Sequence, residues 1–525
     1  MDNIRPPSPS PEETLIITRE LREDVVLHEQ QLEKIMAHLQ QQSEQVSSGW
    51  MPSKGKEGVV ESIQPSPKIR KVEALHTKSH DIVGRLRATW LGRLYISHLK
   101  QYVVVQLIAH WIWRTGYPVY VNYIASRLFK KKEKRWRPLI KLSEFAKKSG
   151  IPIYKLTDAA VVETPEPKVF PTCDQSYLKA PHDRFRFPEI YVATINNAIT
   201  YGGTNFILAD GEVVCHDLYD FERDYTSEEL HGRTLIDPKS ARIRWLLHDE
   251  APEPIPMAAT FVDACAPNYA HWITEVFPRI VLFCADDRFS GVPIVVNDGL
   301  HKNIMESLFL VAGEDRAIIT LPIGRALAVA ELYLTSVAGY VPFERRTNKC
   351  SDHSHGLFSP GAFELLRNHL IGIGWDAELA VWPEKIYLRR NSDVRKVENA
   401  LEIENLLVAR GYVIVEPERL SFLEQVRLFS NAKTIFASSG AALANIIFCQ
   451  PSVKIYIFIS KYENTSYWYW QSMACASGKL INYVFGVVTS KNNQEIHANF
   501  SISCSEVEGI IERDHEQLNS PHFIH

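Results

Sequence analysis

The chain has 525 residues, of which 45% are hydrophobic, so it is long enough for about three domains and can bury a sizeable core. Its 58 Lys and Arg residues nearly balance its 62 Asp and Glu residues, which argues against a protein that binds nucleic acid over its whole surface. The eight cysteines are scattered without a Cys-x-x-Cys pair, which excludes a small disulfide-rich secreted scaffold, and the first residues, MDNIRPPSPSPEE, lack the pattern of a secretory signal. These features predict a cytoplasmic protein.

The first 80 residues are predicted to form a flexible region with one helical element. Residues 1–13 and 47–67 are rich in Pro and Ser and cannot bury enough apolar surface to become ordered. Between them, seven positions follow each other in alternating steps of three and four residues: Thr18, Leu21, Val25, His28, Leu32, Ile35 and Leu39. This spacing fits a short coiled coil, through which the chain would form a homo-oligomer. It also fits a solvated single helix, because Thr18 and His28 interrupt the apolar seam.

Residues 81–138 form a basic segment rich in aromatic residues. From Lys68 to Arg137 the chain has sixteen Lys or Arg residues and only three acidic residues. Two uncharged runs, Gln101–Trp113 and Thr115–Ser126, each fall short of the ~20 residues that a membrane-spanning helix needs. Aromatic side chains beside basic ones suit a segment that lies on an anionic membrane surface, which would hold the protein peripherally on the cytoplasmic face. A helical hairpin packed on the protein body remains an alternative.

The remainder of the chain predicts two α/β domains, at residues 139–345 and 346–525. In the first domain, short apolar runs such as IYVATI, NFILA and PIVVND are separated by turn residues and by a predicted helix from Lys302 to Val311. In the second, the strands KIYLRR, YVIVEP, KTIFAS and VKIYIF alternate with amphipathic helices. Capping-box patterns at Asn399 with Glu402 and at Ser421 with Glu424 mark two helix starts. The alternation predicts doubly wound, mostly parallel sheets whose carboxyl edges face a cleft.

The segment CAPNYAHWITEVFPRIVLF, Cys265–Phe283, is the first cluster with chemical potential. His271 and Glu275 are four residues apart on a predicted helix and therefore share a face, which Arg279 extends by one turn. A histidine oriented by a carboxylate is a suitable general base. The alternative is that His271 is a packing residue and that Glu275 and Arg279 form an ordinary helical ion pair.

The segment KIYLRRNSDVRKVEN, Lys385–Asn399, is the second cluster. Arg389 and Arg390 directly follow a strand, and Arg395 and Lys396 lie in the next loop, where a doubly wound sheet presents groups to its ligand. Guanidinium groups bind phosphate oxygens in pairs and keep their charge, so they could neutralise a departing diphosphate. A solvated basic loop is the alternative.

The segment KTIFASSGAALANIIF, Lys433–Phe448, is the third cluster. Its strand ends at Ser438, Ser439 and Gly440 before a helix of small residues, so that backbone amides at the helix start could approach an anion. The segment lacks the lysine of a P-loop, the glycine spacing of a dinucleotide-binding loop and the G-x-S-x-G pattern of a hydrolase.

In this order and spacing, the three clusters resemble glycosyltransferase family 61, whose members share an N-Y-x-H-W-x-x-E-x-x-P-R-like segment, an R-R strand end and a G-A-x-x-x-N helix start. Many members have His before the G-A pair, where this chain has Ser439, and an acid in the following strand, where it has Tyr456. The resemblance extends from about Ile190 to Phe485 and includes bacterial members that build capsule or lipopolysaccharide glycans. The site residues that it carries over to this chain are Asn268, His271, Trp272, Glu275, Arg279, Arg389, Gly440, Ala441 and Asn445.

The resemblance implies a GT-B-like arrangement of two facing Rossmann-type domains, here preceded by the helical and flexible N-terminal extension. It also implies inversion at the sugar carbon and a nucleotide-sugar donor, UDP-linked, held by the C-terminal domain. The acceptor would be a glycan or lipid-linked glycan of a growing cell-surface polysaccharide or lipopolysaccharide. No cofactor is expected, and because no two aspartates stand in a D-x-D pattern, we expect a metal-independent reaction.

The sequence therefore predicts an inverting glycosyltransferase with a base in the first α/β domain and a donor site in the second. His271 is the expected base, with Glu275 orienting it, while Asn268 and Trp272 shape the acceptor side. Arg389, Arg390 and the amides of residues 438–441 are expected to hold the donor. The alternative is a catalytically silent glycan-binding or scaffold protein with the same fold.

Overall fold

The computed structural model describes residues 69–71, 136–178, 183–230, 233–245, 251–343, 356–373, 382–392, 394–461, 468–489 and 498–519. The chain divides into two compact units, Met1–Gln64 and Pro65–His525, and every described residue belongs to the second. The predicted coiled coil and almost all of the basic aromatic segment lie outside the described residues and stay predictions.

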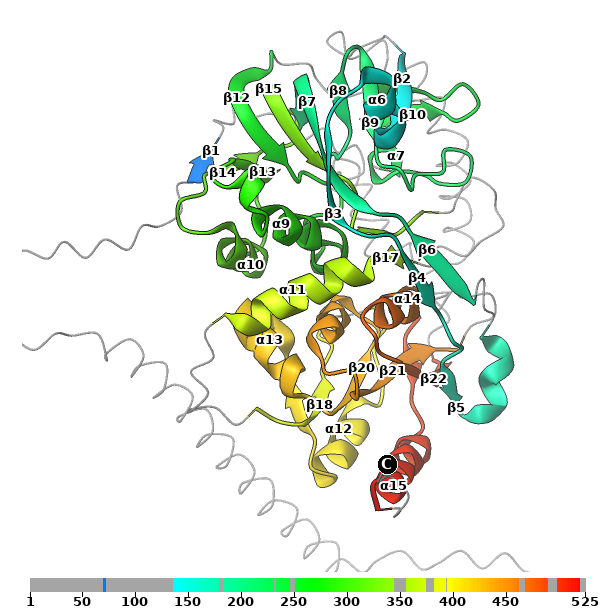
Figure 1. The fold of residues 1–525 in the computed structure, drawn as a ribbon. Helices are drawn as coiled ribbons and strands as arrows, with labels where there is room; N and C mark the ends of the chain where they lie inside the picture. The colour runs from blue at the N-terminus through cyan, green and yellow to red at the C-terminus, as the bar shows by residue number, and fades with distance from the viewer. Residues whose placement is uncertain are drawn as a thin grey trace, which may run out of the picture. The chain divides into compact units, whose positions relative to one another are not determined.

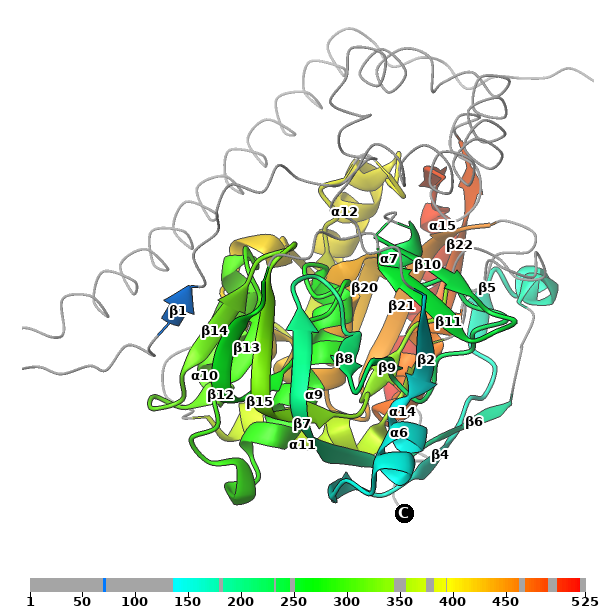
Figure 2. The ribbon, with the colours of Figure 1, turned by 90° about the horizontal axis from the view of Figure 1, so that it is seen from above.

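The first sheet of the described part has twelve strands and is mixed (Figures 1 and 2). Figure 2 shows its strands side by side in the order of their pairing: β1 (Ile69–Lys71), β14 (Ile318–Leu321), β13 (Ile294–Asn297), β12 (Glu253–Thr260), β15 (Ala326–Thr335), β7 (Ile190–Tyr201), β8 (Ile207–Ala209), β9 (Glu212–Cys215), β2 (Arg137–Lys141), β11 (Arg242–Trp245) and β10 (Thr234–Asp237). A twelfth strand, β3 (Ile153–Thr157), pairs with β7. The strands from β1 to β15 run parallel, the pairs β15–β7, β7–β8 and β8–β9 are antiparallel, and β9 is parallel to β2.

The antiparallel half of this sheet differs from the mostly parallel sheet that was predicted. Its tight turns are the reason. Asp210 and Gly211 join β8 to β9 with φ angles of 48° and 81°, the two left-handed positions of a two-residue hairpin turn. Such a turn can connect only antiparallel strands, because a parallel connection needs a long crossover.

Strand β1 is the part of residues 1–80 that the structure describes, and it lies outside the stretches 1–13 and 47–67 that were predicted to be flexible. Its three residues, Ile69–Lys71, pair in parallel with Ile318–Thr320 of β14 at the edge of the sheet. The backbone hydrogen bonds of an edge strand can order a short segment even where its own sequence predicts no structure.

The second sheet is the doubly wound one. Its order is β19 (Val413–Val415), β18 (Lys385–Leu388), β20 (Thr434–Ser438), β21 (Lys454–Ser460), β22 (Asn482–Val488) and β23 (Phe500–Ser501), with β5 (Lys168–Phe170) also paired to β22. The strands from β19 to β22 are parallel. In chain order they stand as 2-1-3-4-5, one of the common doubly wound orders. The four strands predicted from the sequence are confirmed, while β5, β22 and β23 were not predicted.

One hydrophobic core joins the two sheets. It contains Phe261 and Ile294 next to or on strands of the first sheet and Ile435 and Ile457 of the second. The helices between the sheets are α9 (Phe277–Cys284), α10 (Lys302–Ala312), α11 (Pro360–Gly372), α13 (Phe422–Asn431), α14 (Trp468–Ala476) and the 3-10 helix η7 (Ala441–Phe448), several of which are seen in Figure 1. The helix predicted from Lys302 to Val311 is thus confirmed as α10.

The outer faces of the sheets have their own cover. Helix α6 (Leu142–Ser149) packs on the first sheet. On the second sheet, Phe436 and Phe458 point away from the shared core toward α12 (Ala400–Ala409) and α15 (Cys504–Asn519). Neighbouring residues of β20 and β21 alternate between the two cores, and each core contains helices. Both faces of the second sheet are therefore covered by helices.

The two predicted capping boxes have different outcomes. Ser421 and Glu424 form the complete box at the start of α13. Asn399 is the N-cap residue of α12 as predicted, but its side chain makes no capping hydrogen bond. Its amide instead donates to the carbonyl of Ile502 at 2.8 Å and accepts from the Ile502 N–H at 3.0 Å, because this distant backbone segment offers Asn399 both a donor and an acceptor.

The remaining elements are short. Two small sheets pair β4 (Ala160–Glu163) with β6 (Arg184–Phe187) and β16 (Gly339–Tyr340) with β17 (Leu357–Phe358). The short helical segments are η3 (Thr172–Tyr177), α7 (Ser227–Leu230), α8 (Tyr269–His271), η4 (Trp272–Val276), η5 (Asp287–Phe289) and η6 (Pro417–Arg419). Within the described ranges, no helix combines the length and the apolar character needed to cross a membrane.

Candidate functional site

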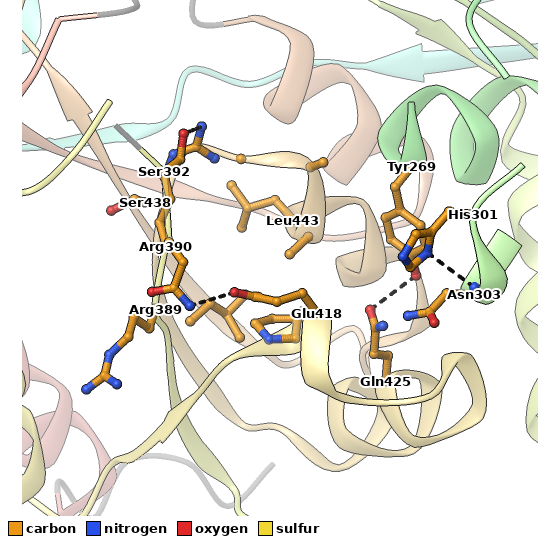
Figure 3. A pocket seen from close by; sticks show the side chains of 16 residues that line it. Tyr269, His301, Asn303, Arg389, Arg390, Ser392, Glu418, Gln425, Ser438 and Leu443 are labelled. Atoms are coloured by element: carbon orange, nitrogen blue, oxygen red, sulfur yellow. Dashed lines mark hydrogen bonds between the residues drawn. The ribbon is translucent and has the colours of Figure 1, made fainter. Parts of the chain in front are cut away.

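A pocket of about 350 Å³ opens at the carboxyl ends of β18 and β20. These two strands are neighbours in the second sheet, and the chain order reverses between them, which is where doubly wound sheets bind ligands. The opposite wall is formed by Tyr269, His301 and Asn303, which belong to the part of the chain that forms the first sheet (Figure 3). The lining residues are Tyr269, His301, Asn303, Leu388, Arg389, Arg390, Asn391, Ser392, Pro417, Glu418, Gln425, Ser438, Gly440, Ala441, Ala442 and Leu443.

Arg389 lines this pocket, but its charge is already balanced. Its Nε and Nη2 donate to the two carboxylate oxygens of Glu404 at 2.8 and 2.6 Å, and its Nη1 donates to Glu416 at 2.9 Å. The hydrogen bond with Glu404 is the largest of the effects that raise the pKa of Arg389. Figure 3 shows the guanidinium turned away from Tyr269, His301 and Asn303. The structure thus uses Arg389 to fix the end of β18 to its neighbours.

Arg390 has no such carboxylate partner among the described residues. Its Nε donates to the carbonyl of Val394 at 3.1 Å and its Nη2 to the Ser392 hydroxyl at 3.3 Å. Burial lowers the pKa of its guanidinium. A Cβ at Gly440 would overlap Nη1 of Arg390, so glycine at this position lets the guanidinium lie directly against the start of η7. Arg390 can therefore bind an anion in the pocket.

The predicted amide site at residues 438–441 is only partly available. Ser438, Gly440 and Ala441 line the pocket, whereas Ser439 does not. The N–H of Ser439 donates to the carbonyl of Phe458 at 3.1 Å, and its hydroxyl accepts from Trp470 Nε1 at 3.1 Å. The amides at the start of η7 lack partners within their own helix, as at every helix N-terminus. Of the predicted amide donors, those of Gly440 and Ala441 can therefore reach a ligand in the pocket, whereas that of Ser439 cannot.

A buried polar network links the two walls of the pocket. The Tyr269 hydroxyl donates to Oδ1 of Asn445 at 2.7 Å, and Nδ2 of Asn445 donates to Oε1 of Gln425 at 2.8 Å. Burial raises the pKa of Tyr269, so its hydroxyl stays protonated. Asn445 is completely buried and does not line the pocket. Asn445 of the predicted motif therefore connects α8, α13 and η7 and does not contact a ligand in the pocket.

Two further predicted residues shape the fold of the first cluster. Asn268 caps α8, its side chain accepting from the N–H of Ala270 at 3.0 Å. Trp272 is fully buried, and its Nε1 donates to Ser307 of α10 at 2.8 Å. Neither residue lines the pocket. Both hold the segment that carries Tyr269 and His271.

His271 and Glu275 form an ion pair between Nδ1 and Oε1, with side chains that are 17% and 14% exposed. Burial lowers the pKa of His271, but attraction and hydrogen bonding to Glu275 outweigh this effect and raise it above 6.5. Burial also raises the pKa of Glu275. Because Nδ1 is held by the carboxylate, Nε2 is the ring nitrogen that can exchange a proton. The pair does not line the pocket, although it follows Tyr269 within the same segment.

Arg279 does not form the ordinary helical ion pair with the Glu275 side chain that was considered above. Its Nε donates to the backbone carbonyl of Glu275 at 3.1 Å, and its Nη2 lies 3.5 Å from the carboxylate of Asp263. Glu275 itself lies in η4, a π-helical turn. Such turns interrupt the regular helix and are frequent at functional sites. Arg279 thereby leaves the Glu275 carboxylate to His271.

Several polar residues of the pocket wall were missed by the sequence interpretation, among them His301, Asn303 and Glu418. His301 caps α10 by accepting from the N–H of Asn303, and Asn303 donates to the carbonyl of Leu420 at 3.0 Å. The Oδ1 of Asn303 is buried without a hydrogen-bond partner in the part of the chain that the structure describes. Glu418 accepts from Asn391 at 2.6 Å. The sequence contained a signal for His301 only, because it is a polar residue directly before the helix predicted to start at Lys302.

The side chains offer no preformed metal site: within the described ranges, no group of three or more His, Cys, Asp or Glu residues is arranged to hold a metal ion. The ionic groups of the pocket are Arg389, Arg390 and Glu418, and only Arg390 is a cation without a carboxylate partner in the described structure.

Comparison with known proteins identifies one family. Residues 269–456 match the model of the family described as Glycosyltransferase 61. This span begins at Tyr269, ends in β21 and includes every residue that lines the pocket. A search of curated proteins finds no match.

Proposed function

We propose that the chain, whose residues 269–456 match the model of the family described as Glycosyltransferase 61, transfers a sugar, with inversion, from a UDP-linked donor to a cell-surface glycan or lipid-linked glycan of the polysaccharide or lipopolysaccharide type. One observation carries the proposal. The pocket between β18 and β20 combines the Arg390 guanidinium, which has no carboxylate partner among the described residues, with the start of η7 on one wall and hydrogen-bonding side chains on the other.

The wall that contains Arg390 suits the diphosphate of the donor. Arg390 supplies a fixed positive charge, and the amides of Gly440 and Ala441 supply donors at a helix N-terminus. As the bond between the sugar and the diphosphate breaks, these groups stabilise the charge that develops on the leaving oxygen. The proposed reaction therefore proceeds without a metal ion.

The opposite wall suits the hydroxyl-rich sugar. His301 and Asn303 lie side by side on this wall (Figure 3), and both side chains can form hydrogen bonds with hydroxyl groups. Glu418 belongs to the other side: it lies in η6 after β19, accepts from Asn391 next to Arg390, and can accept further hydrogen bonds from hydroxyl groups. The pocket thus offers a cation for a phosphate and neutral and anionic acceptors for sugar hydroxyl groups.

His271 is proposed as the base. The acceptor oxygen attacks the anomeric carbon, its proton passes to Nε2 of His271, and the diphosphate departs with the electron pair of the broken bond. Glu275 holds the imidazole through Nδ1 and stabilises the imidazolium that forms. A single displacement of this kind inverts the anomeric configuration and needs no covalent sugar–enzyme intermediate.

The two-sheet architecture supports a GT-B-like arrangement, in which the second domain binds the donor and the first provides the base. The donor wall comes from β18, β20 and η7, while the base follows β12 of the first sheet in sequence. We further propose that residues 81–138 attach the enzyme to the cytoplasmic face of an anionic membrane and that the helix within residues 18–39 mediates self-association.

A thermal-shift screen against nucleotide sugars tests the donor proposal. A ligand at about 100 times its dissociation constant adds about 2.7 kcal/mol of stability, which raises the melting temperature measurably. We expect UDP-sugars to stabilise the protein and to be hydrolysed slowly in the absence of an acceptor. Binding without any turnover, with or without glycan acceptors, would instead favour a catalytically silent glycan-binding protein.

A further inference from the structure

Asp263 follows β12 and is held in place from several sides. Its Oδ1 accepts from the N–H of Cys265 at 2.9 Å, and its Oδ2 accepts from Nδ2 of Asn205, between β7 and β8, at 3.0 Å. Its backbone N–H donates to the side chain of Asn297 at 3.0 Å, and its carbonyl accepts from the same side chain at 2.9 Å. The carboxylate of Asp263 therefore has a fixed position, and it lies outside the residues that match the family.

Arg279 is the cation that this carboxylate meets. The Arg279 side chain is only 5% exposed, and its Nη2 lies 3.5 Å from Oδ2 of Asp263. A guanidinium that is removed from water needs a carboxylate or several acceptors nearby, because an isolated buried charge is costly. Its Nε donates to the backbone carbonyl of Glu275 at 3.1 Å. Asp263 thus supplies the carboxylate within ion-pair distance of Arg279.

The side chain of Glu275 is a second carboxylate close to Arg279. The two residues are four positions apart, the spacing at which side chains on a helix meet. Burial lowers the pKa of Arg279, whereas Asp263 and, more weakly, Glu275 raise it. In the structure, however, Oε1 of Glu275 is paired with Nδ1 of His271. Two basic side chains therefore lie near Glu275, and the ion pair with Asp263 keeps one of them away from it.

Arg389 shows what an arginine does when two carboxylates are free to approach it. It binds both of them, Glu404 and Glu416, through different nitrogens of its guanidinium. Arg279 has two carboxylates in its surroundings as well, but it forms an ion pair with Asp263 and reaches only the backbone of Glu275. The side chain of Glu275 is thus kept for another partner.

The other ionisable groups that act on this pair or on Asp263 carry no positive charge. They are Glu228, His216, Cys265 and Tyr469. Burial raises the pKa of Glu228 to about 7 and lowers that of His216 to about 4, so the histidine is neutral at neutral pH. Burial also keeps the thiol and the phenol protonated. In the described part of the chain, Arg279 is therefore the cation that could draw Glu275 away from His271.

We propose that Asp263 is a positioning residue: by holding Arg279, it reserves the Glu275 carboxylate for His271 and so keeps the base oriented through Nδ1. The inference rests on the proposed function for the role of His271 as the base. Without the charge of Asp263, the Arg279 guanidinium would turn to Glu275, and the imidazole would lose part of the interaction that orients it and stabilises its charged form.

Titration of His271 by NMR in the full-length protein tests this arrangement without any substrate. The signal of its labelled imidazole is identified by its loss in His271→Gln. Asp263→Asn should lower the pKa of His271, because Glu275 is then shared with Arg279. The double variant Asp263→Asn/Arg279→Gln should bring this pKa back toward that of the unmodified protein, because no guanidinium competes for Glu275 any longer.

Asp286→Asn is the matched control, because it takes a carboxylate from another arginine, Arg288, and should leave the pKa of His271 unchanged. An unchanged pKa in Asp263→Asn would overturn the proposal. A lowered pKa that the double variant does not restore would overturn it as well, since Asp263 would then act through its charge alone. If Asp263→Asn does not fold, Arg279→Gln decides: removing the competitor should not lower the pKa of His271, and a fall would contradict the inference.

Sugar transfer provides the second readout. With a UDP-sugar and a glycan acceptor, Asp263→Asn should lower kcat about 10- to 100-fold and keep KM for the donor within about threefold, because the base is misplaced while the donor wall is intact. The two levels of proposal fail differently. The expected NMR result without any transfer by the unmodified protein would leave the positioning role standing and remove the reaction. Transfer by the unmodified protein, with an equally active Asp263→Asn variant, would do the reverse.

Discussion

At the scale of single residues, the pairing of His271 with Glu275 determines how the proposed base behaves. A neutral imidazole accepts a proton, whereas an imidazolium cannot. Because Glu275 raises the pKa of His271 above 6.5, part of the base is already protonated near neutral pH. The fraction of His271 that can act as a base therefore depends on pH.

The first prediction is an acid limb in the rate of sugar transfer. Transfer should decline as pH falls through the raised pKa of His271, because the neutral form is lost. Glu275→Gln should move this limb to lower pH, since burial alone lowers the pKa of the imidazole. The measurement is kcat/KM against pH for both proteins, and an unchanged limb in Glu275→Gln would contradict the assignment.

His271→Ala should lower the rate by about 10²–10⁴-fold and abolish the acid limb, with little change in donor affinity. Near-normal turnover in this variant, together with an inactive but folded Glu275→Gln, would transfer the base role to Glu275.

The sequence predicted part of this site because part of it is local. Arg390, Ser438, Gly440 and Ala441 follow two recognisable strands and line the pocket. Ion pairing is not local: Glu404 and Glu416, which neutralise Arg389, lie 15 and 27 residues further along the chain. No pattern around Arg389 and Arg390 indicates which of the two is paired. Asn303 and Gln425 were missed for the same reason, since distant elements bring them to the pocket.

At the scale of elements, the start of α13 connects the part of the chain that forms the second sheet to α10. Ser421 and Glu424 form the capping box, and the N–H of Phe422 also donates to Glu306 of α10 at 3.0 Å. One turn further on, Gln425 accepts from Asn445 and lines the pocket. The position of one pocket wall therefore depends on a helix start that lies between the two sheets.

The second prediction concerns this helix start. Ser421→Ala should destabilise the protein by about 1 kcal/mol, because it leaves an amide of the first turn without its acceptor. Ser421→Asp keeps an acceptor at the cap and serves as the control. Thermal denaturation of the two variants measures the difference, and equal melting temperatures for alanine and the unmodified protein would show that the box contributes nothing.

Element prediction succeeded where spacing is local and failed where pairing is distant. The strands β18 to β21 and the capping box of α13 follow from periodicity and turn residues. Strand β5 pairs with β22 across more than 300 residues of chain, so that no window around Lys168–Phe170 could indicate its place in the second sheet. Asn399 is the N-cap residue of α12, but it makes no capping hydrogen bond because its amide is bound to the backbone of Ile502.

At the scale of the whole molecule, a single hydrophobic core reaches from strands of the first sheet to strands of the second. The pocket walls on either side are consequently parts of one packed body, linked by Tyr269, Asn445 and Gln425. The sequence indicated two α/β domains but contained no signal for their shared core, which depends on packing between distant helices.

The third prediction concerns the basic segment at residues 81–138. The protein should float with vesicles that contain phosphatidylserine and not with phosphatidylcholine alone, and high salt should release it, because charge attraction is screened within ~8 Å at physiological ionic strength. Replacing Lys130, Lys131 and Lys132 by Gln should weaken flotation. Replacing the exposed Lys147 and Lys148 of α6 is the control. Binding indifferent to lipid charge and to salt would contradict this prediction.

The most direct test of the donor site is a titration of UDP into the unmodified protein, Arg390→Gln and Arg389→Gln. Loss of Arg390 should weaken UDP binding by about 10- to 100-fold with little effect on the melting temperature, because no carboxylate in the described part of the chain is paired with this guanidinium. Loss of Arg389 should have the opposite pattern: a lower melting temperature, because Glu404 and Glu416 lose their partner, with UDP affinity kept within about threefold. Normal UDP affinity in Arg390→Gln, or no UDP binding by the unmodified protein, would contradict the account.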